Sequence, residues 1–575
     1  MANVAEVLVE TLSTVGIKRI YGIVGDSLNG ITNALQKYKN IEWVHVRHEE
    51  AGAFAAGAEA QLTGELAVCA GSCGPGNLHL INGLYDCHRS GAPVLAIAAH
   101  IPSPEVGGDY FQETHPNILF KECSCFCEVV TSAEQMPRLL NIAMQTAKAK
   151  SGVAVLVISG DVALQQACFA ASKESVSYLR PEVVPPEPVL QDIAKRLNAA
   201  KNITVFCGIG AADAHAELMQ LCHALKAPVV HTLRGKPFIE PNNPYDVGMT
   251  GFIGFSSGYH AMEACDTLLL LGTNFPYRQF YPEKAQIIQI DLHGERLGQR
   301  VHLAVGAVGD VANTLKALIP LLQTKQDSSH LEKAREHYQK ARQGLDALAT
   351  KTPDKSPLHP QYLAHCISEI ADEDTVFTAD VGTPSVWAAR YLAMNGSRRL
   401  LGSFNHGSMA NALSQAIGAQ ATYAGRQVIA LCGDGGFSML MGDILTLVQH
   451  KLPIKVIIFN NGALGFVEME MHVGGMLDYA TTLVNPNFAA LAEAVGIKGI
   501  RVDSAVTLSD DLHAAFAHDG PVIVDVAVHR NELIIPPSIQ AAQIKGFSLY
   551  MMKALINGQG DAVLDLMKTN LWRGE

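Results

Sequence analysis

VIALCGDGGFSMLMGDILTLVQHKLPIKVIIFNN, residues 428–461, predicts a buried strand, a glycine-rich turn, an apolar helix and a second buried strand. A glycine-rich turn after a strand leaves backbone N–H groups free to bind a diphosphate. Asp434 in that turn and the side chain of Asn461 offer hard oxygen ligands, which suit a Mg²⁺ that neutralises the diphosphate. The alternative is an ordinary strand–turn–helix with an aspartate on the surface.

The same alternation of short buried strands and helical patterns runs through most of the chain. Candidates such as LAVCA, VAVLVIS, ITVFCG, TLLLLG and VIVDVAV are apolar on both faces, which is typical of parallel strands covered by helices. Segments rich in proline or turn residues, Arg180–Val189 and Ala349–Pro360, predict domain boundaries. We expect an α/β fold with three doubly wound parallel-sheet domains and an amphipathic helical C-terminal tail: residues 1–180, 181–335, 336–530 and 531–575.

Composition limits the class of protein. A chain of 575 residues is too long for one core, and 48% apolar with 17% charged residues describes a well-buried globular protein. A net charge of −12 argues against nucleic acid as a partner. The first residues lack a basic region and a cleavage site, and no apolar run reaches the ~20 residues of a transmembrane helix. We expect a cytoplasmic protein whose membrane contact, if any, is peripheral.

The twelve cysteines are mostly single residues within apolar strands, which is typical of reduced core cysteines. Cys123, Cys125 and Cys127 alternate along one segment and could share a face. They lack paired CxxC spacing, so we expect core or surface thiols there and not a zinc site. Their role stays open.

A second candidate site lies near the N-terminus, where Arg47-His48-Glu49-Glu50 follows the strand pattern WVHV. The spacing from Gly433-Asp434-Gly435 to Asn460-Asn461 resembles the signature of thiamine diphosphate (ThDP) enzymes. ThDP chemistry requires a carboxyl group that hydrogen-bonds N1′ of the aminopyrimidine and favours its imino tautomer. The resemblance of RHE to the family motif assigns this role to Glu49, with Glu50 as the rival. The structural alternative is an acid that favours a helix N-terminus.

The resemblance covers the whole chain. GDSLNG near Gly25, GSCGPGN near Gly74, DYFQETHP near Phe111 and SFNHGSMANALSQAIGA near Met409 are similar to the ThDP-dependent 2-keto-acid enzymes. Within that family the chain looks most like the quinone-linked, lipid-activated pyruvate oxidases, or quinone-dependent pyruvate dehydrogenases. This implies a homotetramer in which Glu49 of one subunit reaches the ThDP held by its neighbour.

Further roles follow from the same resemblance. Gly407 and Met409 would bind the aminopyrimidine, and Gly382 and Thr383 would touch the diphosphate. The Mg²⁺ ligands would be Asp434, Asn461 and the carbonyl of Ala463. The other implied ThDP contacts are Ser408, Gly435, Gly436, Gly462, Leu464, Gly465, Phe466 and Val467. The substrate pocket would be lined by Phe111, Gln112, Phe466 and Glu470, although both phenylalanines could equally be core aromatics.

Two departures from other branches of the family bear on the reaction. Simple decarboxylases carry a tandem histidine pair where this chain has Asp109-Tyr110-Phe111-Gln112. Acetohydroxyacid synthases typically have a Gln-Trp-Gln segment where this chain has GFVEMEM. Both differences favour oxidation of the intermediate over release of an aldehyde or carboligation.

The middle of the chain contains CGIGAADA, residues 207–214, a glycine-rich turn after a strand that could receive a pyrophosphate. The resemblance implies that FAD binds here in an extended path, with Asp291 at a strand end suited to a ribose hydroxyl. The implied FAD contacts are Gly208, Gly210, Thr250, Gly251, Phe252, Ile253, Gly254, Thr273, Asn274, Phe275, Pro276, Tyr277, Arg278, Asp291 and Asp310. Bound flavin alone does not establish redox chemistry, because the synthase branch keeps a flavin without net oxidation.

The tail from Glu532 onward has two apolar groups at near-helical spacing. Its basic and acidic residues balance, so any membrane affinity must come from apolar area. The alternative is a helix docked on the enzyme's own core. The resemblance implies a tail that covers the active site at rest and moves onto lipid when the flavin is reduced. The two groups are Ile544, Phe547, Tyr550, Met551, Ala554 and Leu555, then Val563, Leu564, Met567, Leu571 and Trp572.

We therefore expect an enzyme, at the inner face of the cell membrane, that oxidises pyruvate to acetate and CO₂ and passes electrons through FAD to a membrane quinone. One alternative is an acetolactate-synthase-type carboligase with structural FAD. Another is an oxygen-dependent oxidase that forms acetyl phosphate, and a third is a catalytically silent membrane-binding regulator. The preference between pyruvate and 2-oxobutyrate stays open, since one methylene is worth only ~1–3 kcal/mol.

Overall fold

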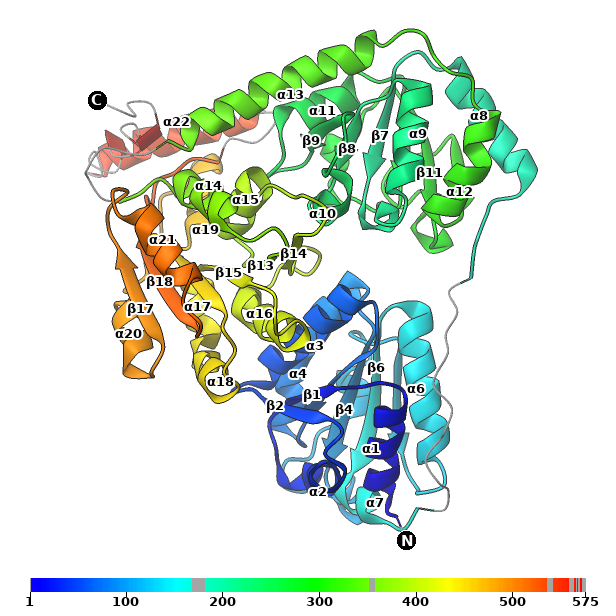
Figure 1. Ribbon diagram of the computed structural model, residues 1–575, viewed down its shortest axis with the longest axis vertical. Helices are drawn as coiled ribbons and strands as arrows, with labels where there is room; N and C mark the ends of the chain where they lie inside the picture. The colour runs from blue at the N-terminus through cyan, green and yellow to red at the C-terminus, as the bar shows by residue number, and fades with distance from the viewer. Residues whose placement is uncertain are drawn as a thin grey trace.

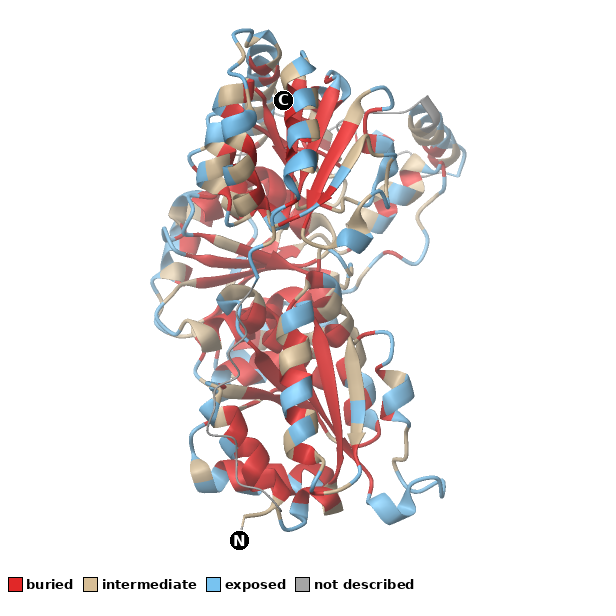
Figure 2. Ribbon diagram, turned by 90° about the vertical axis from the view of Figure 1, so that its right-hand side faces the viewer, coloured by how far each residue is buried: buried red, intermediate tan, exposed pale blue. Residues whose placement is uncertain are grey.

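The computed structural model describes residues 2–167, 181–350, 357–534 and 541–557, together with residues 563, 564, 566, 569 and 570. Its core consists of three six-stranded parallel sheets with flanking helices (Figure 1). The sheets are the most buried parts of the molecule (Figure 2). The predicted three-domain α/β fold is therefore confirmed, while the domain boundaries stay predictions.

The first sheet has the strand order β2-β1-β3-β4-β6-β5. Strands β4 and β6 are buried along their whole length, which explains their continuous apolar sequences. The strands are β1 (Arg19–Gly22), β2 (Glu42–His45), β3 (Ala67–Gly71), β4 (Val94–His100), β5 (Phe126–Val130) and β6 (Val153–Ser159). The helices are α1 (Val4–Thr14), α2 (Asn29–Tyr38), α3 (Glu49–Thr63), α4 (Pro75–Ser90), α5 (Pro116–Leu119), α6 (Met136–Lys150) and α7 (Gly160–Leu164).

The second sheet has a different order, β12-β11-β10-β7-β8-β9. This is the strand order of the dinucleotide-binding doubly wound fold, with the reversal between β7 and β10. The strands are β7 (Ile203–Cys207), β8 (Val229–His231), β9 (Asp246–Met249), β10 (Thr267–Leu271), β11 (Gln286–Asp291) and β12 (Val305–Val308). The helices are α8 (Glu187–Ala199), α9 (His215–Leu225), α10 (Lys236–Ile239), α11 (Ser256–Glu263), α12 (Val311–Leu318) and the long α13 (Ser329–Leu348), which runs toward the third domain (Figure 1).

The third sheet, β14-β13-β15-β16-β18-β17, repeats the strand order of the first. In both, the order reverses between the first and third strands in sequence, and ligands of open α/β sheets bind at such points. The strands are β13 (Val376–Ala379), β14 (Arg399–Gly402), β15 (Val428–Gly433), β16 (Lys455–Asn460), β17 (Lys498–Val502) and β18 (Val522–Ala527). The helices are α14 (Pro360–Ile370), α15 (Thr383–Tyr391), α16 (Asn411–Thr422), α17 (Asp434–Leu440), α18 (Ile444–Gln449), α19 (Gly465–Val473), α20 (Phe488–Ala494) and α21 (Leu508–Phe516).

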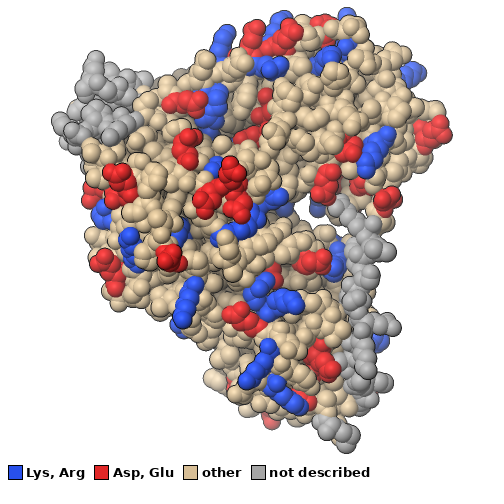
Figure 3. Space-filling model, viewed as in Figure 1, with Lys and Arg blue, Asp and Glu red and all other residues tan. Residues whose placement is uncertain are grey.

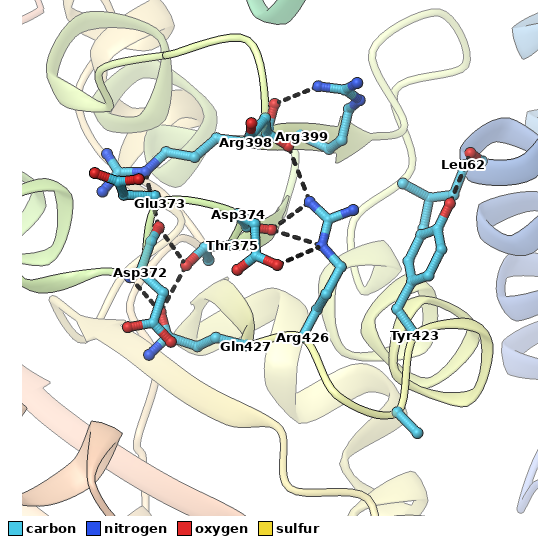
Figure 4. A network of polar contacts seen from close by, with 12 residues as sticks. Leu62, Asp372, Glu373, Asp374, Thr375, Arg398, Arg399, Tyr423, Arg426 and Gln427 are labelled. Atoms are coloured by element: carbon cyan, nitrogen blue, oxygen red, sulfur yellow. Dashed lines mark hydrogen bonds and ion pairs between the residues drawn. The ribbon is translucent and has the colours of Figure 1, made fainter.

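The first and third domains are packed together through α3 and α16 (Figure 1). The two backbones approach so closely that a Cβ added to Gly418 would lie 2.0 Å from the Ala55 carbonyl oxygen. At the end of α16, the Tyr423 hydroxyl donates a 3.1 Å hydrogen bond to the Leu62 carbonyl (Figure 4). The third domain is therefore held closely against the first domain along α16.

Charged side chains of both signs are interspersed over the face shown in Figure 3. Three arginines lie close together near the amino-terminal ends of β13 and β14, and each donates to backbone carbonyls (Figure 4). Arg398 donates to the carbonyl of Ala371, and Arg426 donates to that of Ser397. These arginines brace the loops of the sheet.

The tail helix α22 (Ala541–Ile556) packs on α19, with Tyr550 and Ala554 buried. Of the predicted apolar stripe, Ile544 and Leu555 are each 58% exposed. Met552 and Ile556 are exposed with them, so the outer side of α22 is apolar, whereas Leu549 lies against Gly475. In the second predicted group, Val563 is buried and Leu564 is exposed, and the remaining three residues lie outside the described residues: Met567, Leu571 and Trp572. Among the described residues no helix has the length and apolarity needed to cross a membrane.

Candidate functional site

The carboxylate of Asp434 lies at the point where the third sheet reverses its strand order, directly after β15. The residue is 2% exposed, which excludes the surface aspartate of the alternative interpretation. Its Oδ1 accepts a hydrogen bond from the Gly435 N–H (2.9 Å), and its Oδ2 accepts bonds from the Gly462 N–H (2.8 Å) and the Asn485 amide (2.7 Å). Burial raises the pKa of Asp434 above its ordinary value. A cation bound to this carboxylate would stabilise its charged form.

The loop that follows β16 lies against Asp434. Asn461 Oδ1 accepts a 3.0 Å hydrogen bond from the Ala463 N–H, and Gly462 has a positive φ of 67°. Leu464 N–H donates to the Thr481 carbonyl and Leu483 N–H donates to the Gly462 carbonyl, so a neighbouring segment braces the loop. The structure thus brings the three predicted Mg²⁺ ligands to one place. It adds Asn485, which sequence analysis missed because an asparagine 51 residues from Asp434 carries no motif.

Other predicted ThDP contacts meet around the same turn. A Cβ added to Gly435 would lie 2.8 Å from Leu464 Cδ2 and 3.4 Å from Met409 Cε. One added to Gly433 would lie 3.6 Å from Pro384, which directly follows Thr383. Gly382 caps α15 with φ 121°, a conformation that favours glycine. The side chain of Met409 and the turns after β13 and β15 therefore surround one position.

Asp380 is a second buried carboxyl group at this position and was not predicted as a site residue. Its Oδ1 accepts a 2.9 Å hydrogen bond from the Ala412 N–H, and burial raises its pKa to about 7. Its Oδ2 has no hydrogen-bond partner among the described residues, and a Cβ on Gly436 would lie 2.4 Å from it. An unsatisfied buried oxygen beside a glycine turn is typical of a site whose ligand completes the hydrogen bonding.

The first domain contributes a separate group around Glu49, which begins α3 and is 5% exposed. Glu49 Oε2 and His79 Nδ1 lie 2.9 Å apart. The first turn of α4 lies beside this carboxylate, since a Cβ on Gly76 would lie 3.0 Å from Glu49 Oε1. The loop between β3 and α4 contacts Gln112, whose Cβ would lie 2.8 Å from a Cβ on Gly74. Glu49 and Gln112 therefore contact nearby residues at the start of α4.

The rival carboxylate, Glu50, has a different environment. Its Oε1 accepts a 2.7 Å hydrogen bond from Asn82, which also donates to the Ser408 hydroxyl at 2.8 Å. His406 Nε2 and Asn82 Oδ1 lie 2.8 Å apart. Glu50 thus takes part in the contact between the first and third domains, whereas among the described residues no hydrogen bond joins Glu49 to the third domain. This difference favours Glu49 for the cofactor role.

The predicted substrate pocket is not assembled within a single chain. Phe111 is 78% exposed, whereas Phe466 is half-buried against the core of the third domain and Glu470 is exposed. Among the described residues no hydrogen bond or ring contact joins Phe111 or Gln112 to Phe466 or Glu470. The single chain therefore holds two half-sites, one in the first domain and one in the third.

The predicted FAD residues follow the carboxyl ends of several strands of the second sheet, and Gly208, Gly210 and Thr273 lie at the reversal between β7 and β10. The Gly208 and Gly210 N–H groups donate to the carbonyls of Leu271 and Gly272, so these two amides are not free for a pyrophosphate. Close packing of the loops after β7 and β10 explains both glycines: a Cβ on Gly210 would lie 2.7 Å from Gly272 Cα. The role of the two glycines in FAD binding stays a prediction.

Other predicted FAD residues fit a dinucleotide better. Thr250 is buried, and its hydroxyl has no hydrogen-bond partner among the described residues. Asp291 is 3% exposed at the end of β11, and burial raises its pKa. Phe252 and Tyr277 form an edge-to-face pair with centroids 4.8 Å apart.

The carboxylate of Asp310 has structural partners instead, because it caps α12 and binds the Val183 N–H. The remaining predicted FAD residues lie in the loops that connect these elements: Gly251, Ile253, Gly254, Thr273, Asn274, Phe275, Pro276 and Arg278.

Three family models match the chain, one for each sheet domain. The thiamine pyrophosphate enzyme N-terminal TPP binding domain matches residues 2–119, the central domain matches 190–318 and the C-terminal TPP binding domain matches 380–526. The chain belongs to the thiamine pyrophosphate enzyme family. Thiamine pyrophosphate is the same compound as ThDP, and the buried Asp434, the loop after β16 and the turn after β13 fit its diphosphate and a magnesium ion.

Individual relatives give a finer comparison. The chain is 40% identical to protein YdaP of Bacillus subtilis (strain 168) over 98% of each chain. It is 30% identical to the pyruvate oxidase of Lactiplantibacillus plantarum, over 91% of this chain and 88% of that one. It is also 30% identical to an acetolactate synthase of Mycobacterium bovis, over 92% and 89%.

Proposed function

We propose that the chain is a ThDP- and FAD-dependent enzyme that decarboxylates pyruvate oxidatively to acetate and CO₂ and passes the electrons to a membrane quinone. The observation that carries this proposal is a dinucleotide-type strand order in the domain between two ThDP half-sites. The similarity to a pyruvate oxidase supports the choice of substrate.

Within this proposal each half-site has a distinct task. Bound ThDP supplies an electron sink for decarboxylation, and bound FAD accepts two electrons. Asp434, Asn461 and the carbonyl of Ala463 hold Mg²⁺ against the diphosphate. Glu49 hydrogen-bonds the aminopyrimidine and holds its proton, while His79 at 2.9 Å keeps the carboxylate oriented.

A second copy of the chain completes the site. Phe111 and Tyr110 in the first domain are exposed, and so are Tyr479 and Val484 beside the loop after β16. Burying these side chains between two copies would bring Glu49 and Gln112 of one subunit to the Mg²⁺ loop of the other. A homotetramer with such paired subunits is the assembly we propose.

The tail supports the proposed membrane contact. The outer side of α22 presents four exposed apolar side chains, and α22 packs on α19, the helix that carries Phe466. Tyr550 stacks on His472 of α19 with ring centroids 3.8 Å apart. The phospholipid surface would be the inner face of the cell membrane. Binding of the outer side of α22 to it would change the contact between α22 and α19.

Product analysis tests the reaction. Purified protein with ThDP, Mg²⁺, FAD, pyruvate and a dye that accepts two electrons should form acetate and reduce the dye in a one-to-one ratio. The similarity to acetolactate synthase favours a second candidate, carboligation with a structural flavin. Acetolactate without dye reduction would identify that reaction and overturn the proposal. Formation of acetyl phosphate that requires both oxygen and phosphate would identify oxygen, and not a quinone, as the electron acceptor.

A further inference from the structure

The loop after β3 holds Gln112 by both its backbone and its side chain. Gln112 has a left-handed backbone, with φ 61°, which is uncommon for a residue with a side chain. Gly74 packs against this backbone, since its added Cβ would lie 2.9 Å from the Gln112 carbonyl oxygen. The thiol of the preceding residue, Cys73, donates a 3.3 Å hydrogen bond to Gln112 Oε1. A conformation of this kind persists only where its surroundings impose it.

The position of Cys73 is itself fixed. Cys73 is 5% exposed, and its backbone N–H donates a 3.0 Å hydrogen bond to the Ser27 hydroxyl. That hydroxyl lies 2.9 Å from the hydroxyl of Ser72. The thiol therefore meets Gln112 from a fixed position at the end of β3, next to the first turn of α4, which touches Glu49.

A protonated thiol is a weak donor, and of the two ends of an amide only the oxygen accepts. The contact with Cys73 thus orients the Gln112 amide with its oxygen toward the sulfur. No other hydrogen bond holds this amide among the described residues. Both N–H groups of Gln112 are then available to a ligand that carries an acceptor, such as a carboxylate.

We propose that Cys73 is a positioning residue whose thiol presents the amide N–H groups of Gln112 to the carboxylate of the 2-keto acid. This inference rests on the proposed function. It assigns to a buried cysteine a role in substrate affinity, in addition to packing.

The test uses the full-length enzyme loaded with ThDP, Mg²⁺ and FAD. Cys73→Ala removes the donor, and Cys73→Ser keeps one. We expect Cys73→Ala to raise the KM for pyruvate about tenfold, a change in binding free energy of roughly one hydrogen bond. The kcat should stay within about twofold of the wild-type value. Cys73→Ser should restore most of the affinity. Cys87→Ala is the matched control, because the Cys87 thiol also donates a 3.3 Å bond, to the Ala53 carbonyl, outside the pocket.

A double-mutant cycle separates positioning from packing. In a Gln112→Ala background, Cys73→Ala should leave KM unchanged, because the amide it orients is gone. The inference would be overturned if Cys73→Ala alone left KM unchanged, or if it raised KM equally in the wild-type and Gln112→Ala backgrounds. Turnover of pyruvate by the wild-type enzyme would still uphold the proposed function. A wild-type enzyme that does not consume pyruvate would overturn both. If Cys73→Ala does not fold, failure of Cys73→Ser to keep the wild-type KM would overturn the inference.

Discussion

Asn485 donates a 2.7 Å hydrogen bond to Asp434 Oδ2, and the same amide donates to Asn460 Oδ1 at 3.0 Å. One side chain therefore ties the carboxylate after β15 to the end of β16. The orientation of the proposed Mg²⁺ ligand depends on a residue outside the predicted ligand set.

Replacing Asn485 by alanine should weaken the binding of ThDP with Mg²⁺ about tenfold. The carboxylate of Asp434 then lacks a supporting hydrogen bond, so part of the binding free energy is used to orient it. Titration of the apoprotein with ThDP at fixed Mg²⁺, followed by circular dichroism, measures the change. Asn487→Ala is the control, since Asn487 caps α20 through the Ala490 N–H and does not touch Asp434. Equal losses in both variants would contradict the assigned role.

Glu49 and Glu50 can be distinguished by isosteric substitution. Glu49→Gln should lower kcat by about 10²-fold or more, because the amide cannot hold the proton at the aminopyrimidine. Glu50→Gln should keep most of the activity and lower the stability of the contact with Asn82 and the third domain. Steady-state kinetics together with thermal melting of both variants tests this. Near-wild-type turnover in Glu49→Gln would remove Glu49 from the mechanism.

Asp246 predicts a pH dependence of stability. It is buried at the start of β9, with Oδ1 3.4 Å from His231 Nε2, and burial raises its pKa to about 8 and lowers that of His231 to about 4. Between pH 6.5 and 8 the folded protein holds a proton on Asp246 that the unfolded chain releases. His231 is neutral in the folded state, whereas in the unfolded chain, with a pKa of about 6.5, it is partly protonated near pH 6.5 and offsets part of the Asp246 effect at that end of the range. The free energy of unfolding should therefore fall as pH rises, by at most about 1.4 kcal/mol per pH unit.

Asp246→Asn stays uncharged, so it should lose this slope and gain stability relative to the wild type as pH rises to 8. Thermal or urea unfolding at pH 6.5, 7.2 and 8 measures the difference. Parallel pH curves for the two proteins would show that Asp246 does not carry a proton in the folded state.

Contact between α22 and α19 predicts how the tail is released. A Cβ on Gly546 would lie 1.9 Å from the Val473 carbonyl oxygen, so Gly546→Val should separate the helices. We expect higher basal turnover and stronger binding to phosphatidylglycerol–phosphatidylethanolamine vesicles, with little effect of salt because the tail has no net charge. Gly344→Val, in α13 where an added Cβ meets nothing within 4 Å, is the control. A Gly546→Val protein with unchanged turnover and vesicle binding would exclude the tail as a switch.

The three-sheet architecture was predictable because parallel strands buried on both faces leave continuous apolar runs, as in β4 and β6. The turn at Asp434 was predictable because a phosphate-binding loop uses a short local motif. Asn485, Asp380 and Cys73 were not, since their importance comes from contacts between distant segments. The glycines at 208 and 210 show the converse, because close packing against Gly272 explains them without a ligand.

Sequence periodicity did not indicate how the tail helix packs. Apolar residues occur around most of α22, so spacing alone could not indicate which side meets α19. Gly546 and Gly475 determine the contact, since the two backbones can approach only where side chains are missing. Ile544 and Leu555 are left on the outer side.

The most direct test of the central claim is anaerobic addition of pyruvate to the purified protein with ThDP and Mg²⁺, with the flavin spectrum followed with and without vesicles. We predict loss of the oxidised flavin absorption, faster in the presence of lipid and reversed by a quinone. A flavin that stays oxidised while acetolactate accumulates would contradict the oxidative reaction, and a protein that binds no flavin would contradict the assignment of the middle domain.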